Sequence, residues 1–260
     1  MDDVLREPCR QWFVKADPFV QLKLLDLQEL DSGLHRLAVK RAGLPVLAAI
    51  ATQEAELSSL RGQLVTHQTE ISDQGRAASK LEADIEQVRA RATRDQQRLD
   101  AGMITNAKEL ESLQSELASL ARRQDVLEEE ELEILEVREQ AEHAAAAAQA
   151  RIDVVEVRLA ELVVERDREL SEIDAEAASL TAQRVDLAPS LPADLVALYD
   201  RVRADRGGIG AAALRRRRCE GCHLELAGND LTEIRDAAPD DVLRHDDCGR
   251  ILVRTAESGL

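Results

Sequence analysis

Aromatic residues are almost absent from this 260-residue chain, at 2% of its composition. A compact globular core usually takes much of its buried area from Phe, Tyr and Trp, so this scarcity argues against an ordinary globular fold. Long apolar runs are also missing, since none approaches the roughly 18 residues that a membrane-spanning helix needs. The N-terminus lacks a basic start followed by an apolar stretch, which argues against a signal peptide. We therefore expect a soluble, cytoplasmic protein with no membrane association.

Positive charge is scarce relative to negative charge. The chain has 34 Lys and Arg residues against 51 Asp and Glu residues, and its net charge is −17. This balance disfavours nonspecific nucleic-acid binding by the whole molecule, so any such binding would be local. Cysteine is scarce too. Three of the four cysteines cluster near the C-terminus, which suits a metal site better than a disulfide framework.

Leu, Ile, Val and Ala recur with helical spacing where aromatic residues are missing. Asp17 and Pro18 predict a helix start, and Gly43 with Pro45 predicts a break in that helix. Beyond the break, apolar residues recur every seven positions. A second series with the same period lies three residues further along the chain. This heptad pattern is typical of a coiled coil. Its first series is Ile50, Leu57, Leu64, Ile71, Ala78, Ile85, Ala92 and Leu99.

The heptad pattern stops around Gly102 and then resumes. Asn106 can cap a second helix, with Glu109 in capping-box position. Heptads in this helix continue through Leu113, Leu120, Leu127, Ile134, Ala141, Ala148, Val155 and Leu162. The sequence therefore predicts an antiparallel coiled-coil hairpin over residues 17–188, kinked at the break, with its turn at about 100–106.

A register for this hairpin follows if the turn is centred between Gly102 and Met103. It pairs Ile50 with Val155, Leu57 with Ala148, and Ile85 with Leu120. Large residues then face small ones in several layers, which keeps the layer volume roughly constant.

Residues 1–16 precede the periodic region and form an irregular N-terminal extension. Two interpretations stay open: a short disordered segment, or an annotation artefact if translation naturally starts at Val14. Cys9 is most simply a free thiol without a role.

Residues 189–260 predict a second domain, made of a short helix over 193–206 and a zinc ribbon. Cys219-x2-Cys222 and His245-x2-Cys248 are two knuckles, each followed or interrupted by a glycine. Three thiolates and one imidazole can complete a tetrahedral structural site for one Zn²⁺ ion. Segments 209–214, 242–244 and 251–253 read as strands. His223 competes with His245 for the fourth position but is poorly placed beside Cys222. The alternative is an empty remnant with a few exposed cysteines.

The sequence resembles the bacterial C4-type zinc-ribbon proteins that carry a long coiled-coil hairpin, over residues 16–255. The matching motifs are residues 24–31 (LLDLQELD), residues 106–113 (NAKELESL), Leu191-Pro192 with Leu198-Tyr199, residues 219–222 (CEGC) and residues 248–252 (CGRIL). The resemblance implies a kinked hairpin packed near a zinc ribbon. It also implies binding of partners, which in this family include a sigma factor, secretion components and a messenger RNA. The family cysteine that matches position 245 is His here. High Ala, Arg and Val content is typical of an actinobacterial member.

Two functions compete. The first is a non-enzymatic adaptor or scaffold, in which the hairpin holds a protein partner and the ribbon a second one. The second is a nucleic-acid-binding regulator, in which phosphates contact Arg215, Arg216, Arg217, Arg218 and Arg250. Against the second, residues 207–260 hold ten acidic residues and lack stacking aromatics. The arginine run could equally be an exposed strand that balances the acidic coil. The sequence contains no paired catalytic carboxylates, nucleophile motif or phosphate loop, so we expect no enzyme.

Overall fold

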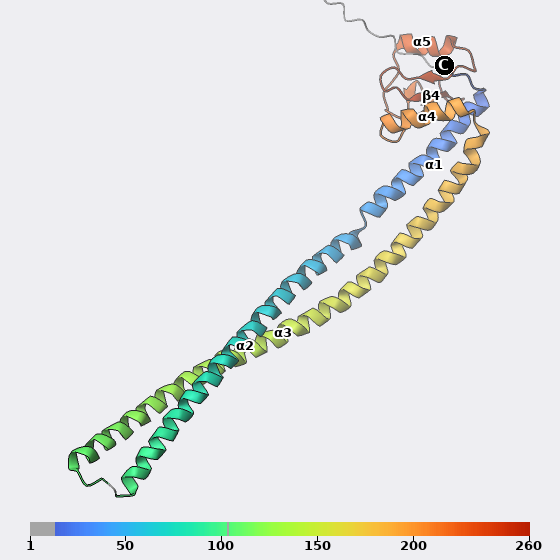
Figure 1. Ribbon diagram of the computed structural model, residues 1–260. Coiled ribbons are helices and arrows are strands. Elements are labelled where there is room, and N and C mark those ends of the chain that lie inside the picture. Colours follow the sequence, from blue (N-terminus) through green and yellow to red (C-terminus); the bar gives the residue numbers. More distant parts are fainter. Residues whose placement is uncertain (1–13, 103) are drawn as a thin grey trace, which may run out of the picture. The chain divides into compact units, whose positions relative to one another are not determined.

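The computed structural model describes residues 14–102 and 104–260, which form two compact units (Figure 1). The ribbon unit contains residues 14–45 and 166–260, and the coiled-coil unit contains residues 46–165. Most of the predicted N-terminal extension, including Cys9, lies outside the described residues. No described helix is both long enough and apolar enough to span a membrane.

Five helices and four strands make up the described chain. The helices are α1 (Pro18–Ala42), α2 (Pro45–Asp100), α3 (Ala107–Leu187), α4 (Ala193–Asp205) and α5 (Gly228–Asp236), and a 3-10 turn η1 (Ala188–Ser190) follows α3. The strands are β1 (Ala211–Arg215), β2 (Arg218–Cys219), β3 (Leu243–Arg244) and β4 (Ile251–Arg254). The predicted class, a mainly α-helical hairpin followed by a small C-terminal sheet, is confirmed.

The ends of the long helices follow the capping chemistry in the sequence. The Asp17 carboxylate accepts a hydrogen bond from the Phe19 amide at 2.8 Å, and Pro18 occupies the first turn of α1. At the other end of the hairpin, the Asn106 side chain accepts from the Lys108 amide at 3.0 Å, where α3 begins. The predicted break also occurs, because α1 ends at Ala42 and α2 begins at Pro45.

The register that we expected for the coiled coil is wrong by one heptad. Within the coiled-coil unit, Leu57 and Leu60 pack with Ile152 and Val155, so Val155 lies at the level of Leu57 and not of Ile50. Ion pairs on the two sides of this layer agree with the shift: Arg61 contacts Glu156 at 2.8 Å, and Arg151 contacts Glu56 at 2.9 Å. A heptad repeat places an apolar residue opposite another after any seven-residue shift, so the apolar pattern alone could not select between these registers.

The four strands form one sheet in the order β2-β1-β4-β3, with β1 and β4 parallel and the outer pairs antiparallel. Because side chains alternate along a strand, the sheet has two apolar faces. Ile251 and Val253 pack with α1 and α4, whereas Leu252 packs with α5 and the cysteines. The sequence did not predict α5, and residues 215–218, which we allowed as a single exposed strand, instead turn between β1 and β2. Val14 and Ala16, which we assigned to the irregular extension, are buried in the first of these clusters.

A buried polar cluster joins α1 to α3, α4 and the strand that leads into the ribbon. The Asp31 side chain is 1% exposed and accepts a hydrogen bond from the Tyr199 hydroxyl at 2.8 Å. Arg184 and Arg203 contact the same carboxylate at 2.8 and 3.1 Å. Burial raises the pKa of Tyr199 far above its usual range, and the Asp31 carboxylate raises it further, so the hydroxyl stays protonated and donates. Beside this cluster, the side-chain oxygen of Gln28 on α1 accepts a hydrogen bond at 2.7 Å from the amide that precedes β1, which fixes the sheet to α1 within the ribbon unit.

Candidate metal centre

The first knuckle lies at the end of the β1–β2 hairpin. Leu214 pairs with Cys219, which is fully buried, and the His223 amide donates to the Cys219 carbonyl at 2.7 Å to close the turn. Gly221 fits where no other residue would. A Cβ at this position would lie 2.7 Å from the Cδ of Arg250 and 2.9 Å from the Cβ of Ala212. The glycine therefore allows the knuckle to fold against β1.

The second knuckle connects β3 to β4. The His245 amide donates to the Arg250 carbonyl at 2.9 Å, and the Gly249 amide donates back to the His245 carbonyl at 2.6 Å. Gly249 has a φ of +70°, in the left-handed region that glycine adopts at little cost. These hydrogen bonds hold His245 and Cys248 on the same side of the turn.

The two knuckles bring four metal-ligating atoms together. One atom each from Cys219, Cys222, His245 and Cys248 lies within 4.8 Å of the others. His245 Nδ1 is 3.3 Å from Cys222 Sγ and 3.1 Å from Cys248 Sγ. Ligands of one tetrahedral zinc ion are about 3.5–3.8 Å apart, given metal–ligand bonds of about 2.0–2.3 Å. The donor set and its spacing therefore fit one zinc ion. His223 is exposed and does not belong to this cluster.

The orientation of the His245 ring favours coordination through Nδ1. Its side chain is 1% exposed, Nδ1 faces two sulfurs, and Nε2 is buried without a hydrogen bond. The nearest carboxylate to Nε2 is Asp247 Oδ2, at 3.6 Å. A carboxylate behind a metal-bound histidine typically fixes the tautomer and the ring orientation. Sequence reasoning gave Asp247 no role, although its position within the second knuckle could have suggested one.

The thiols differ in acidity. Burial raises the pKa of Cys219 to about 11. Burial also acts to raise the pKa of Cys248, but hydrogen bonds from the Arg250 backbone and from the His245 side chain outweigh it and lower the pKa to about 7. A thiolate is the form that binds metal, so Cys248 is more ready to bind than Cys219 near neutral pH.

The four arginines of residues 215–218 form the tight turn between β1 and β2. Arg216 and Arg217 have φ values of 47° and 65°, as a two-residue hairpin turn requires. Three of the side chains are engaged locally. Arg215 pairs with Glu257 at 2.8 Å, Arg217 donates to the Gly259 carbonyl at 3.2 Å, and Arg218 donates to the His223 carbonyl at 2.7 Å.

Arg250 lies apart from this turn. The β1–β4 register pairs Ala211 with Ile251, so Arg250 flanks the start of β1, whereas Arg215 ends it. The five arginines that we grouped as nucleic-acid contacts therefore do not form one patch.

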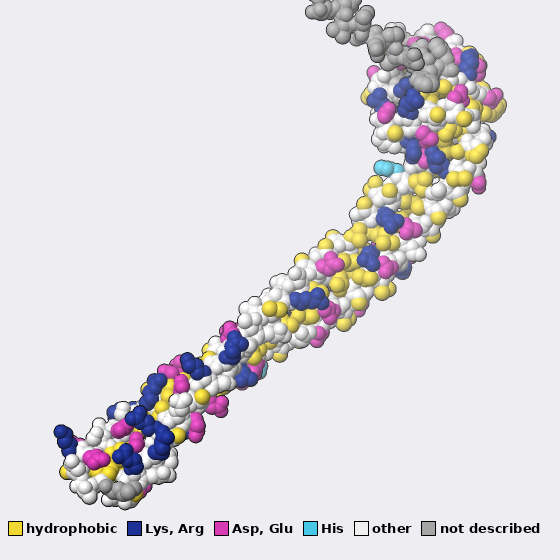
Figure 2. Space-filling view, in the orientation of Figure 1, with side chains coloured by type: hydrophobic (Ala, Val, Ile, Leu, Met, Phe, Trp, Pro, Cys, Tyr) yellow, Lys and Arg dark blue, Asp and Glu magenta, His cyan; other side chains and the backbone are white. Residues whose placement is uncertain are grey.

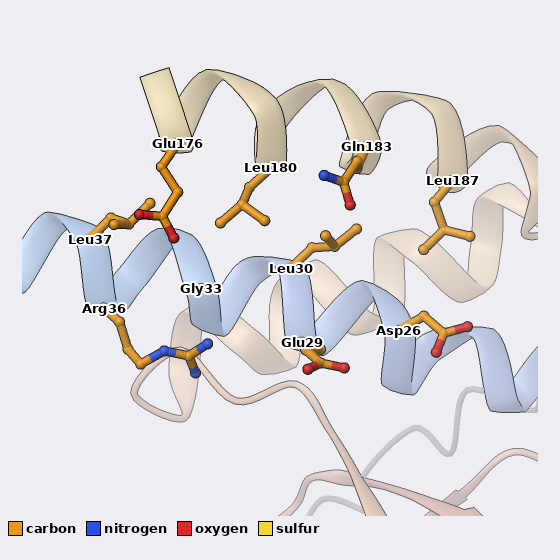
Figure 3. A pocket seen from close by; sticks show the side chains of 10 residues that line it. All are labelled: Asp26, Glu29, Leu30, Gly33, Arg36, Leu37, Glu176, Leu180, Gln183 and Leu187. Atoms are coloured by element: carbon orange, nitrogen blue, oxygen red, sulfur yellow. The ribbon is translucent and has the colours of Figure 1, made fainter. Parts of the chain in front are cut away.

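A groove runs between α1 and the last turns of α3 within the ribbon unit (Figure 3). It encloses about 540 Å³. Leu30, Leu37, Leu180 and Leu187 line it, with Leu180 packed over Gly33. Its rim carries three acidic residues, Asp26, Glu29 and Glu176, and one basic residue, Arg36. Within the described residues, none of these four charges has an ion-pair partner within 4.0 Å.

A helical hairpin followed by a sheet with two metal-binding knuckles defines a zinc-ribbon protein of the coiled-coil hairpin class. Residues 27–207 match the family model of the CT398-like coiled coil hairpin domain, and residues 218–252 match the C4-type zinc ribbon domain. The chain therefore belongs to the CT398-like coiled-coil hairpin family with a C4-type zinc ribbon. His245 departs from the four cysteines that this ribbon type implies.

Relatives of similar length occur in mycobacteria, in agreement with the actinobacterial composition. Rv2229c of Mycobacterium tuberculosis is 36% identical over 241 residues, which cover 93% of this chain and 98% of that protein. ML1638 of Mycobacterium leprae is 28% identical over 225 residues, which cover 86% of this chain and 96% of that protein.

Solved structures with this fold include proteins of three bacteria. A Mycobacterium smegmatis protein has a TM-score of 0.81 at 33% identity, covering 93% of this chain and 100% of its own. CT398 from Chlamydia trachomatis has a TM-score of 0.75 at 18% identity, with coverage of 91% and 98%. HP0958 from Helicobacter pylori has a TM-score of 0.51 at 17% identity, with coverage of 92% and 98%. The last two support the fold alone.

Proposed function

We propose that this protein is a non-enzymatic, cytoplasmic adaptor that holds a partner protein in the groove between α1 and α3. The groove carries the proposal, because Leu30, Leu180 and Leu187 are only partly buried and, among the described residues, its four rim charges have no ion-pair partner. A ribbon built around one structural zinc ion would form the second recognition surface. Both matching families describe a coiled coil or a metal module, and neither names an enzyme.

The charges on the rim of the groove indicate which kind of partner would bind there. Asp26, Glu29 and Glu176 outnumber Arg36, so a partner with basic residues beside an apolar face would complement the groove. Amphipathic helices bind in this way, placing their apolar side chains at helical spacing between two helices of the receptor. We therefore infer that the occupant is a basic amphipathic helix of another protein.

Site-specific photo-crosslinking in cells of the source organism tests this proposal. A benzoylphenylalanine at Gln183, an exposed groove residue, should crosslink to a partner segment that is basic and amphipathic. The same group at Thr69, exposed in the coiled-coil unit, is the matched control. Glu29→Lys should then lower the Gln183 crosslink yield several-fold. A crosslinked segment that is acidic or that belongs to a second copy of this chain would refute the proposed occupant, as would equal yields at both positions.

We further propose that Cys219, Cys222, His245 and Cys248 are the zinc ligands. The purified chain should then contain one equivalent of zinc, measured by mass spectrometry of the metal. His245→Ala and Cys222→Ser should lower this content and weaken zinc retention against a chelator. His223→Ala is the matched control and should retain the full equivalent. Loss of zinc in the control with retention in His245→Ala would reassign the fourth ligand.

Nucleic-acid binding through residues 215–218 is the second candidate. Exposure of all four side chains favours it, whereas their contacts with Glu257, Gly259 and His223 favour a structural role for the turn. RNA and DNA binding should be compared at two salt concentrations for the native chain and for a chain with the four arginines changed to Ala. Equal, salt-independent binding by both would eliminate this candidate.

A further inference from the structure

Three arginine side chains meet at the second knuckle. Arg206 follows the end of α4, Arg244 lies in β3, and Arg250 precedes β4. A Cβ on Gly249 would be 3.1 Å from an Nη2 atom of both Arg206 and Arg244. Since both nitrogens lie 3.1 Å from one point, at most twice that distance separates them. A larger residue at this position would force both guanidinium groups to shift by a few tenths of an ångström, so the glycine lets them lie close over the knuckle.

Neutral backbone groups hold the side chains of Arg244 and Arg250 in place. The Arg244 Nε donates to the Gly249 carbonyl at 2.9 Å, and the Arg250 Nη2 donates to the Arg206 carbonyl at 2.9 Å. A guanidinium group has five N–H donors, so most of the donors in this cluster are left for a ligand.

No carboxylate neutralises the cluster. Among residues 14–102 and 104–260, no Asp or Glu oxygen lies within 4.0 Å of a side-chain nitrogen of Arg206, Arg244 or Arg250. Asp247, in the same knuckle, lies instead 3.6 Å from His245 Nε2. Elsewhere in the ribbon unit, Arg203 and Arg215 each have an acidic partner, Asp31 and Glu257. Like charges at this separation repel one another unless an anion lies between them.

The negative charge of the metal centre would balance the charge of only one of these three arginines. Three thiolates, one neutral imidazole and a zinc ion would carry one net negative charge. Arg250 is placed to balance it, because its side chain packs over Gly221 of the first knuckle and its Nε is buried without a hydrogen bond. Arg206 and Arg244 remain, and both are exposed.

We propose that Arg206 and Arg244, supported by Arg250, bind a phosphate dianion at the second knuckle. The oxygens of a phosphate group are about 2.5 Å apart and accept charge-assisted hydrogen bonds at about 2.8 Å, so one phosphate can bridge nitrogens separated by up to about 8 Å. Arginine forks match this geometry, and exposure of the pair leaves the site open to a ligand. The ligand is either free inorganic phosphate or a phosphate monoester on another molecule.

Calorimetric titration of the zinc-loaded full-length chain tests the site. Inorganic phosphate and O-phosphoserine are the two ligands, and they distinguish the free ion from a monoester. The affinity for either ligand should fall about tenfold in the Arg206→Gln variant, and by a similar factor of about ten in the separate Arg244→Gln variant. Arg235→Gln, which removes the same charge from an exposed position on α5, is the matched control and should leave the affinity within twofold. Zinc content is measured for every variant and should not change.

Any of four outcomes would overturn the proposal. The native chain could bind neither ligand. Arg235→Gln could weaken binding as much as Arg206→Gln, which would indicate nonspecific charge attraction. The chain could instead bind an RNA oligomer without terminal phosphates but neither dianion, which would indicate a nucleic-acid surface. Loss of zinc in the Arg206→Gln Arg244→Gln chain, with no phosphate binding by the native chain, would show that these arginines only balance the metal centre.

Discussion

The coiled-coil unit and the ribbon unit are stabilised in different ways. In the coiled-coil unit, apolar layers such as Leu57 with Val155 alternate with exposed ion pairs, and Figure 2 shows basic and acidic side chains interspersed towards its loop end. In the ribbon unit, the buried Asp31 cluster and the four metal-ligating side chains join segments far apart in the sequence. The first arrangement distributes stability over many similar layers, whereas the second concentrates it in a few polar residues.

Removal of zinc should give the largest difference between the two units, because it should unfold the ribbon and leave the helices folded. Cys219, Cys222 and Cys248 belong to the small apolar cluster between the sheet and α5, so an empty site would leave that cluster too small to fold. We expect a strong chelator to abolish the dispersed amide resonances of residues 211–254, while the helical circular dichroism at 222 nm decreases only slightly. Zinc addition should restore the spectrum. A ribbon that keeps its resonances without metal would contradict this account.

Asp31→Asn should give the next largest effect, confined to the ribbon unit. The substitution removes the charge that Arg184 and Arg203 contact. We expect a loss of about 2–3 kcal/mol, less than for a fully buried pair because both arginines are partly exposed. The control is Asp174→Asn, which removes an exposed partner of Arg41 and should cost less than about 1 kcal/mol.

Hydrogen exchange of the α4 and β1 amides measures the effect of Asp31→Asn. Exchange should accelerate there and stay unchanged in the coiled-coil unit. Equal losses of stability from Asp31→Asn and Asp174→Asn would mean that the buried cluster contributes no more to stability than an exposed ion pair.

The sequence predicted the features that depend on local chemistry. The caps at Asp17 and Asn106, the break before Pro45 and the spacing of the two knuckles each need only a few neighbouring residues. Features that depend on distant partners were missed. The cluster around Asp31 joins residues more than 150 positions apart, so no local pattern marks it.

Two short elements of the ribbon were missed for other reasons. The β1–β2 turn places Arg216 and Arg217 in the left-handed region that usually requires Gly or Asn, so their sequence did not suggest a hairpin. Helix α5 has nine residues and no capping side chain at its start, which leaves little pattern for sequence analysis to detect.

The smallest expected effect concerns the register of the coiled coil. A double-mutant cycle of Arg61→Gln and Glu156→Gln should give a coupling energy of about 0.2–1 kcal/mol, because the two exposed side chains form an ion pair at 2.8 Å. Added salt should reduce this coupling by screening. In the register that the heptads alone suggested, these side chains lie a further heptad apart and out of reach. The cycle, measured by urea unfolding, therefore gives the contribution of this ion pair to the observed register. A coupling of zero would mean that the ion pair does not help to select it.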